Sequence, residues 1–382
     1  MLAPYDAPMD AAPLVPPPHV ARPLRLLPFR GLTLTPTRIG APSSVRAFTR
    51  PYKDVAERLL RWERRGQLSR DEEPAVYLHE FTSGGVTVRG LVGALDISRR
   101  ASGRDDVAVF PHEGIHPAQA EELAARMTEM QTNPAPIVLV HQGPAAVREL
   151  MDTVQRRTPL REFTDRGGQQ HRIWAIRNDA ELALLDRSLE SARALIADGH
   201  HRYAAYLQMQ RDDPRSATDA GLAMLVDQDD TPLHLGPIHR VLGHVSLDGL
   251  RAAAERVGAT FRPAEAEPAV AALARDTLVA TDGRDWATVH VDLTSDRVAV
   301  DVLHERLLPA LAPQPTRIGY HHAVDETLAA LTKRPGLAVL LPAPEFVQVL
   351  AICATDRLLP EKATSFQPKP SVGVLIRSLR DE

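Results

Sequence analysis

The sequence has a single cysteine, Cys353, among its 382 residues. One thiol excludes an intramolecular disulfide framework, and it excludes a zinc or iron–sulfur site held by several cysteines. No stretch approaches about eighteen consecutive apolar residues, so no segment is expected to span a membrane. The N-terminus also lacks the charged start and the continuous apolar run of a signal peptide. These features predict a cytoplasmic protein.

The sequence has little excess charge of either sign. Its 49 acidic and 45 basic residues give a net charge of −4, and the pI is about 6.4. This balance disfavours a protein that coats nucleic acid or an anionic membrane by bulk charge. A hydrophobic content of 44% with 25% charged residues excludes wholesale disorder.

Proline is abundant, with 32 in the chain and ten in the first fifty residues. Because Pro16, Pro17 and Pro18 cannot hold a helix or a central strand, residues 1–22 are predicted to be a disordered lead-in. A proline-rich ligand for a partner domain is the alternative. The rest of the chain is long enough for two domains. We expect one over 23–215 and one over 216–382, both α/β.

Helical and strand-like patterns are mixed along the chain. Val55, Leu59 and Trp62 share one face of a helix predicted over 52–65. Order is expected to begin at 24–29, and strands are expected at 76–81, 86–95, 137–140, 172–176, 194–197, 222–226, 233–235, 287–293, 297–301 and 337–341. Further helices are expected from 117, and over 144–156, 180–193, 201–211, 247–256, 302–312 and 323–332. Without strict β–α–β alternation, this order predicts an α/β or α+β fold with mixed sheets flanked by helices.

The most informative segment runs from residue 194 to residue 205. A short apolar strand ends in the pair Asp198-Gly199, and a helix is predicted to begin at once. Glycine permits a backbone with positive φ. A helix start presents unpaired N–H groups and the positive end of the helix dipole. With two histidines and an arginine on that opening turn, the segment predicts a pocket for a phosphate or carboxylate.

Each residue of this segment has a functional and a structural interpretation. The Gly199 backbone, His200, His201 and Arg202 are the candidate phosphate ligands, and His200 and Asp198 are also candidate catalytic residues. Adjacent side chains on a helix point about 100° apart, so the two histidines are poorly placed to hold one metal ion. On the structural interpretation Asp198 caps the helix, Arg202 makes a surface ion pair and the histidines are idle.

Other candidates lie far away in the sequence. Glu113 precedes a helix and is a candidate general base, or a first-turn carboxylate favoured by the helix dipole. His112 beside it and His239 are candidate cofactor ligands, although His239 also fits an ordinary loop. Lys362 and Lys369 are candidates to neutralise phosphate charge, or parts of a proline-rich turn.

One further histidine and two pairs of adjacent residues also have both a ligand-binding and a structural interpretation. His116 starts a predicted helix and belongs to the same patch as Glu113 or is simply exposed. His321 and His322 are adjacent, which disfavours a shared metal ion. Gly167 and Gly168 read as a hairpin turn, since no lysine motif follows them.

The segment Ala-Asp-Gly-His-His-Arg-Tyr-Ala-Ala, 197–205, resembles the signature of a bacterial family known as domain of unknown function 1015. Further resemblance lies in 27–31, 62–74, 111–113, 164–174, 238–240 and the closing motif 359–373. It therefore covers residues 24–379. One element departs from the family pattern: Gly40-Ala-Pro-Ser-Ser44 stands where the family has Ala-Pro-Pro-Tyr-Asp.

The Asp-Gly-His-His-Arg segment is in turn similar to loops of the ParB/sulfiredoxin superfamily, which hold nucleotide phosphates. That superfamily includes DNA-partition proteins, a thiol-repair enzyme and kinases that act on free serine. Thiol repair is disfavoured because Cys353 lies far from the motif. DNA partition is disfavoured because no helix-turn-helix or basic run is visible.

The resemblance therefore implies a nucleotide-binding protein that uses ATP or ADP with magnesium. It also implies a kinase that transfers phosphate to the hydroxyl of a small metabolite such as free serine. A non-catalytic nucleotide or metabolite sensor is the alternative. In either case Glu113, His200, His201, Arg202 and His239 are expected to converge on one cleft, with Lys362 or Lys369 at its rim.

Overall fold

A computed structural model describes residues 14–42, 44, 48, 55–294, 296–355 and 357–380. These residues form two compact units. The larger unit contains 14–111, 115–233 and 368–380, and the smaller unit contains 112–114 and 234–367. These limits differ from the expected domains 23–215 and 216–382, and the division into independently folding domains stays a prediction.

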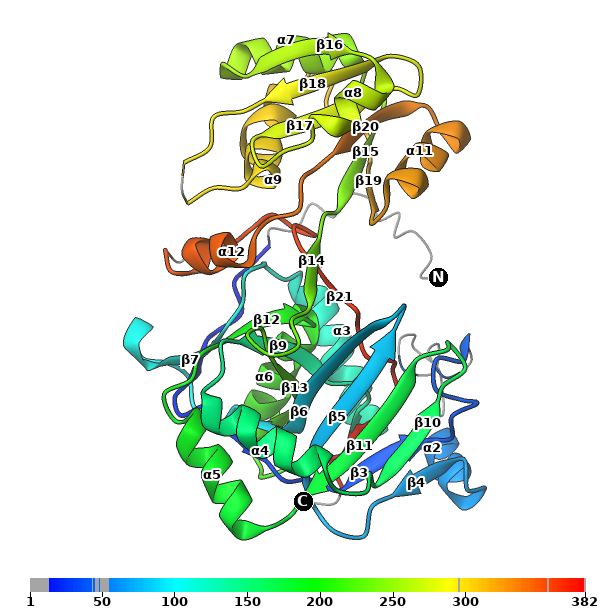
Figure 1. Ribbon diagram of the computed structural model, residues 1–382, viewed down its shortest axis with the longest axis vertical. Helices are drawn as coiled ribbons and strands as arrows, with labels where there is room; N and C mark the ends of the chain where they lie inside the picture. Colours follow the sequence, from blue (N-terminus) through cyan, green and yellow to red (C-terminus); the bar gives the residue numbers. More distant parts are fainter. Residues whose placement is uncertain are drawn as a thin grey trace. The chain divides into compact units, whose positions relative to one another are not determined.

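The larger unit is built on a mixed sheet (Figure 1). Among the described residues this sheet has ten strands, in the order β1-β7-β12-β9-β13-β6-β5-β11-β10, with β2 paired to β6. The strands are β1 (Val20–Ala21), β2 (Leu26–Leu27), β5 (Val76–Ser83), β6 (Val86–Asp96), β7 (Val107–Phe110), β9 (Ile137–His141), β10 (Arg161–Thr164), β11 (Gln170–Ile176), β12 (Ala194–Asp198) and β13 (Ala220–Asp227). β12 runs parallel to β7 and antiparallel to β9.

Helices and a smaller sheet complete this unit. The helices are α2 (Val55–Arg64), η1 (Arg104–Asp106), α3 (Pro117–Met130), α4 (Ala145–Gln155), α5 (Asp179–Leu189) and α6 (His200–Asp212). α4 packs against β5 and β11, α6 packs against β9 and β13, and α3 packs against α6. The smaller sheet has the order β4-β3-β22-β8. Its strands are β3 (Gly31–Leu34), β4 (Leu68–Arg70), β8 (Thr132–Asn133) and β22 (Ile376–Ser378).

Strand β22 returns to the larger unit after the chain has formed the smaller one. It is held by Arg377, whose side chain is fully buried. The guanidinium donates hydrogen bonds to Asn133 Oδ1 and to the carbonyl oxygens of Ala217 and Ala220. A buried arginine is stable only when such acceptors replace its water, so this side chain fixes the position of the strand.

The smaller unit has its own mixed α/β architecture. Its main sheet has the order β16-β18-β17-β20-β15-β19, and a separate pair is β14-β21. The strands are β14 (His234–Gly236), β15 (His239–Gly243), β16 (Thr260–Ala264), β17 (Thr277–Thr281), β18 (Trp286–His290), β19 (Ile318–His321), β20 (Gly336–Leu340) and β21 (Ser365–Gln367). The helices are α7 (Leu247–Val257), α8 (Ala266–Ala271), α9 (Ala299–Val302), η2 (Leu303–Leu307), α10 (Leu308–Ala310), α11 (Val324–Lys333) and α12 (Phe346–Cys353).

The expected fold class is confirmed, because sheets are flanked by helices in both units. The ten-stranded sheet of the larger unit is mixed, whereas the strands of the smaller unit's main sheet pair antiparallel. The first predicted helix is confirmed from Val55 onward, and its residues 52–54 lie outside the described part. Val55, Leu59 and Trp62 are buried on one face, as the pattern predicted. The strands expected at 76–81 and 86–95 pair with each other as the hairpin β5–β6, and the turn predicted at 167–168 lies between β10 and β11. No helix in the described part of the chain has the length and apolar character needed to cross a bilayer.

Three expectations are corrected. Residues 14–22 of the expected lead-in are ordered, since Val15 pairs with Ile115 and β1 pairs with β7; residues 1–13 lie outside the described part. The strand predicted over 297–301 is wrong. Val298 instead caps α9, with its N–H donating to Asp301 Oδ2 at 3.2 Å. His239 lies on strand β15 rather than in a loop.

Candidate functional site

The junction of β12 and α6 forms as the sequence predicts. Gly199 joins them with φ of 99°, in the left-handed region that favours glycine. A Cβ atom here would lie 2.9 Å from Arg202 Nη2 and 3.0 Å from Ile137 Cγ2. Both the backbone angle and the close approach of its neighbours therefore require glycine.

Asp198 does not cap the helix, so this part of the structural interpretation is wrong. The first turn of α6 has no side-chain cap hydrogen bond. The two carboxylate oxygens of Asp198 instead accept from two cations, Arg202 Nη2 at 2.6 Å and Lys369 Nζ at 2.5 Å. Burial raises the pKa of Asp198, but Lys369 and Arg202 outweigh it and hold the pKa below its usual value. Asp198 is therefore an ionised carboxylate between two positive charges.

Arg202 is held on two sides. Its Nη1 donates to the carbonyl oxygens of Pro136 at 2.5 Å and Ala135 at 3.2 Å, while Nη2 bonds Asp198. The ion pair expected on the structural interpretation is present, with an arginine side chain that is 22% exposed. A guanidinium fixed at three points and still open to solvent has the geometry of an anion-binding group.

The histidines of this turn are packed rather than idle. His200 is buried. His201 Nε2 accepts a hydrogen bond from the His116 N–H at 3.1 Å, and the two imidazole rings stack with centroids 6.0 Å apart. His116 is buried, so the expectation of a simply exposed side chain is wrong. Because Nε2 of His201 is the acceptor, the neutral ring carries its proton on Nδ1.

Lys369 reaches this junction from a segment fixed elsewhere in the larger unit. Gln169, which immediately precedes β11, donates from Nε2 to the Lys369 carbonyl oxygen at 2.9 Å. Its Oε1 accepts from the backbone N–H and the hydroxyl of Ser371, at 3.1 and 3.0 Å. The Gln169 side chain therefore forms hydrogen bonds to the residues on both sides of Pro370.

A buried chain of side chains lies behind Gln169. His171 Nε2 lies 3.2 Å from Asp165 Oδ2, and His79 Nε2 lies 3.0 Å from His171 Nδ1. Asp165 Oδ1 accepts the Gln169 N–H at 3.0 Å. Burial raises the pKa of Asp165, but bonds from Ser371, His171 and the Gln169 N–H outweigh it and lower the pKa. Sequence reasoning missed His79, Gln169 and Ser371, since isolated residues of these types carry no local signal.

The other predicted residues lie in the smaller unit. His112 Nε2 lies 2.6 Å from Thr364 Oγ1, and Glu113 Oε1 accepts the Ala363 N–H at 3.1 Å. Glu113 Oε1 is also 3.6 Å from His112 Nε2. These contacts tie His112 and Glu113 to the closing motif, with Lys362 next to them in the left-handed region at φ of 56°.

His239 is a buried acceptor within its own sheet. Its Nδ1 accepts the Leu341 N–H at 3.1 Å. Burial, together with the charges of Arg240, His321 and His322, lowers its pKa to about 4. Arg240 beside it is fully buried and donates to the carbonyl oxygens of Ile238, Glu361 and Lys362. The bonds to Glu361 and Lys362 give Arg240 a role in holding the closing motif, whereas His239 bonds the residue that follows β20.

The structure thus gathers the predicted residues into two groups. Asp198, Gly199, His200, His201, Arg202 and Lys369 belong to the larger unit. His112, Glu113, His239 and Lys362 belong to the smaller unit. The convergence of both groups on one cleft stays a prediction.

A magnesium site is not formed by these residues. Among the described residues, no group of three histidine, cysteine or acidic side chains is arranged to hold a metal ion. Asp198, the carboxylate at the β12–α6 junction, has both oxygens in ion pairs with cations. No step is therefore routed through magnesium below.

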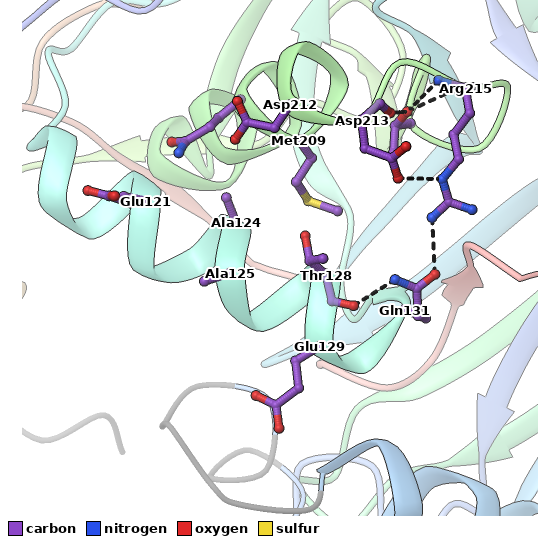
Figure 2. Close-up of a pocket in the computed structure, with 12 residues that line it drawn as sticks. Glu121, Ala124, Ala125, Thr128, Glu129, Gln131, Met209, Asp212, Asp213 and Arg215 are labelled. Carbon is purple, nitrogen blue, oxygen red and sulfur yellow. Dashed lines mark hydrogen bonds and ion pairs between the residues drawn. The ribbon is translucent and has the colours of Figure 1, made fainter.

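A surface cavity of about 610 Å³ lies over α3 and α6 (Figure 2). Its residues include Ala124, Met209 and Asp212, so it lies at the opposite end of α6 from Gly199. Arg215 extends between Asp213 and Gln131 at its edge. The sequence did not predict this cavity, and it is separate from the β12–α6 junction.

The chain belongs to the family described as protein of unknown function (DUF1015), whose model matches residues 28–308. This confirms the resemblance to that family, and the similarity of residues 198–202 to the ParB/sulfiredoxin superfamily stays a prediction. No curated protein sequence matches the chain at a significant level.

Several solved structures are similar at low identity. A conserved hypothetical protein from Pyrococcus furiosus is 13% identical with a TM-score of 0.41, over 72% of this chain and 93% of that one. A free serine kinase mutant in complex with ADP is 14% identical with a TM-score of 0.39, over 70% and 89%. SbnI with a C-terminal truncation, from Staphylococcus aureus, is 10% identical with a TM-score of 0.41, over 70% and 83%. Likenesses of this size leave the function to be argued from the site itself.

Proposed function

We propose that the larger unit binds the phosphates of a nucleotide, ATP or ADP, at the start of α6. The observation that carries the proposal is the meeting of Arg202 and Lys369 at Asp198, beside a helix start without a side-chain cap. Two cations and a helix N-terminus attract the same kind of ligand, a compact anion.

The hydrogen-bond inventory supports this ligand class. A lysine ammonium has three N–H donors and an arginine guanidinium has five. Among the described residues, one donor of Lys369 goes to Asp198, and three donors of Arg202 go to Asp198, Ala135 and Pro136. Two donors on each cation remain for a phosphate. Asp198 then serves to hold both cations in place, and the three side chains keep a net charge of +1.

The finer part of the proposal is phosphoryl transfer to the hydroxyl of a small metabolite, with free serine the first candidate. It rests on the similarity of residues 198–202 to loops of the ParB/sulfiredoxin superfamily. In this reaction the hydroxyl oxygen forms a bond to the transferred phosphorus, the bond to the leaving nucleotide oxygen breaks, and the Glu113 carboxylate takes the hydroxyl proton. The bond from the Ala363 N–H to Glu113 Oε1 supports this role because it orients the carboxylate.

Calorimetry with ATP, ADP and CTP tests the binding proposal. We expect binding by the wild-type chain and a loss of about tenfold or more in Arg202→Ala, the usual effect of removing a charged hydrogen-bond partner. Arg211→Ala is the matched control, since Arg211 is an exposed residue in the last turn of the same helix. Absence of binding by all three nucleotides would overturn the proposal.

The transfer reaction is tested separately. The wild-type chain is incubated with ATP or ADP and a pool of small hydroxy compounds that includes serine, and phosphorylated products are measured. We expect Glu113→Gln to lower the rate by about 10²–10⁴ while nucleotide binding persists. Full activity in this variant would show that Glu113 is not the base.

A nucleotide or metabolite sensor is the second candidate function. It is favoured by the segment 40–44, Gly-Ala-Pro-Ser-Ser, which lacks the tyrosine and aspartate of the family element it replaces. A sensor would bind nucleotide in the calorimeter and leave it unchanged in the product assay.

A further inference from the structure

Lysine is rare in this chain: only Lys53, Lys333, Lys362 and Lys369 occur among its 45 basic residues. Lys369 is flanked by Pro368 and Pro370, which fix their own φ angles and provide no N–H for a backbone hydrogen bond. The position of its ammonium group therefore depends on what holds this short segment from outside.

Gln169 is the residue that holds it. Its side-chain amide donates to the Lys369 carbonyl oxygen and accepts twice from Ser371, so three hydrogen bonds converge on one side chain. The lysine side chain then extends from this fixed backbone to Asp198.

Gln169 is in turn fixed by Asp165. The Asp165 carboxylate accepts the Gln169 N–H, and the Asp165 N–H donates to the Gln169 carbonyl oxygen at 2.9 Å. Gly168, with φ of 84°, makes the tight turn between these two residues possible.

The two buried histidines have fixed donor and acceptor roles in the hydrogen bonds that lead to Asp165. An ionised Asp165 only accepts, so His171 donates from Nε2, and its Nδ1 accepts from His79 Nε2. His79 and His171 are almost fully buried, and the Asp165 carboxylate is completely buried. Each hydrogen bond therefore sets the orientation of the next group along the chain.

We infer that Gln169 is a positioning residue for the phosphate site, held by the chain His79–His171–Asp165 and acting through Lys369. This inference rests on the proposed nucleotide binding at the α6 start, and it adds residues that take no part in contacting the ligand. The chain of hydrogen bonds begins at His79 on β5 and His171 on β11, continues through the 165–169 turn to the segment 368–371, and ends at Asp198.

The first test needs no nucleotide. An amine-reactive acylating reagent is applied to the full chain, and mass spectrometry gives the rate at Lys369, with the exposed Lys333 as internal reference. We expect Gln169→Ala to raise the Lys369 rate about three- to tenfold, because freeing the segment releases the ammonium from Asp198. Gln170→Ala is the matched control, since Gln170 is the next residue in the chain and is exposed at the start of β11. Gln169→Glu keeps the acceptor for Ser371 and loses the donor to the Lys369 carbonyl oxygen. The Lys369 acylation rate in this variant should therefore lie between the rates in wild type and in Gln169→Ala.

The second test is a double-mutant cycle on ADP affinity. We expect Gln169→Ala and Lys369→Ala each to weaken binding about tenfold, and the double variant to be no weaker than Lys369→Ala alone. A Gln169→Ala variant that weakens binding equally with and without Lys369 would show a general structural effect and overturn the inference.

The two tests separate the inference from the proposed function. If the wild-type chain binds no nucleotide, the proposed function fails, and an increased Lys369 acylation rate in Gln169→Ala still supports the positioning role. If the wild type binds nucleotide and neither the acylation rate nor the affinity changes in Gln169→Ala, the inference fails and the proposed function stands.

Discussion

Lys369 Nζ and Asp198 Oδ1 lie 2.5 Å apart although 171 residues separate them in the sequence. The pair connects the strand–glycine–helix junction, which the local sequence defines, to a segment that reaches it only in the folded protein. The ion pair is thus the point at which distant parts of the chain complete the candidate phosphate site.

Replacing Asp198 with asparagine removes the negative charge between Arg202 and Lys369. We expect Asp198→Asn to lower the free energy of unfolding by about 1–2 kcal/mol, since two charge-assisted bonds are weakened at a partly exposed position. Urea denaturation at pH 7 measures this change. Asp212→Asn, at an exposed position of the same helix, is the control and should stay within about 0.5 kcal/mol of wild type.

Gly199→Ala should be more costly than an alanine at another glycine with positive φ. Gly258 caps α7 at φ of 75°, and a Cβ there meets no atom within 4 Å. Its replacement should cost about 1 kcal/mol for the left-handed backbone alone. At Gly199 the contacts with Arg202 and Ile137 add to that cost, so we expect about 2–3 kcal/mol. Equal losses in the two variants would show that the neighbours of Gly199 yield without cost.

His141 predicts a loss of stability in weak acid. It is buried at the end of β9, and burial lowers its pKa to about 4, with Arg148 lowering it and Asp227 raising it. Between about pH 6.5 and pH 4 the unfolded chain binds a proton at this residue that the folded chain does not. The free energy of unfolding therefore decreases as the pH is lowered from about 6.5 to about 4. One such group contributes up to about 1.4 kcal/mol per pH unit.

Urea denaturation at pH 7, 6 and 5 measures this slope, and His141→Gln should make it shallower. His234→Gln replaces an exposed histidine and serves as the control. An unchanged slope in His141→Gln would assign the acid sensitivity to other groups.

Asp301 predicts the opposite dependence on pH. Its carboxyl is completely buried, Oδ1 has no hydrogen-bond partner among the described residues, and burial raises its pKa to about 6. A carboxyl with a raised pKa destabilises the folded chain increasingly as the pH rises from its ordinary value of 3.8 to about 6, and the cost is complete above that. Asp301→Asn keeps an acceptor for the Val298 N–H, and should therefore raise the free energy of unfolding by about 1–2 kcal/mol at pH 8 and by less at pH 5. A loss at pH 8 would mean that the approach of Arg357 at 3.8 Å outweighs burial.

The features that sequence predicted well are those set by neighbouring residues. The β5–β6 hairpin follows from alternating residues on both sides of the Gly84-Gly85 turn, and the start of α6 follows from Gly199. The capping prediction for Asp198 failed because Arg202, one helical turn later, and Lys369 compete for the same carboxylate. The local sequence around Asp198 contains Arg202, but it does not indicate that Lys369 lies beside Asp198 in the folded protein.

The parts that sequence could not predict depend on pairings between distant short segments. Strand β22 has three residues and takes its place between β3 and β8 through Arg377, which resembles any other arginine in the sequence. The sequence predicts a strand over 297–301, whereas the bond from the Val298 N–H to Asp301 marks the start of helix α9 there. Gln169 gave no signal, since its role exists only when residues 368–371 lie beside it.

The return of residues 368–380 to the larger unit has a consequence for biosynthesis. A ribosome makes the segments of the smaller unit between 234 and 367 before it makes Lys369 and strand β22. A nascent chain that has emerged only as far as the smaller unit still lacks one strand of the β4-β3-β22-β8 sheet and one of the two cations at Asp198. Translation that stops before residue 369 therefore yields a larger unit that lacks strand β22 and has Arg202 as the one of these two cations at Asp198.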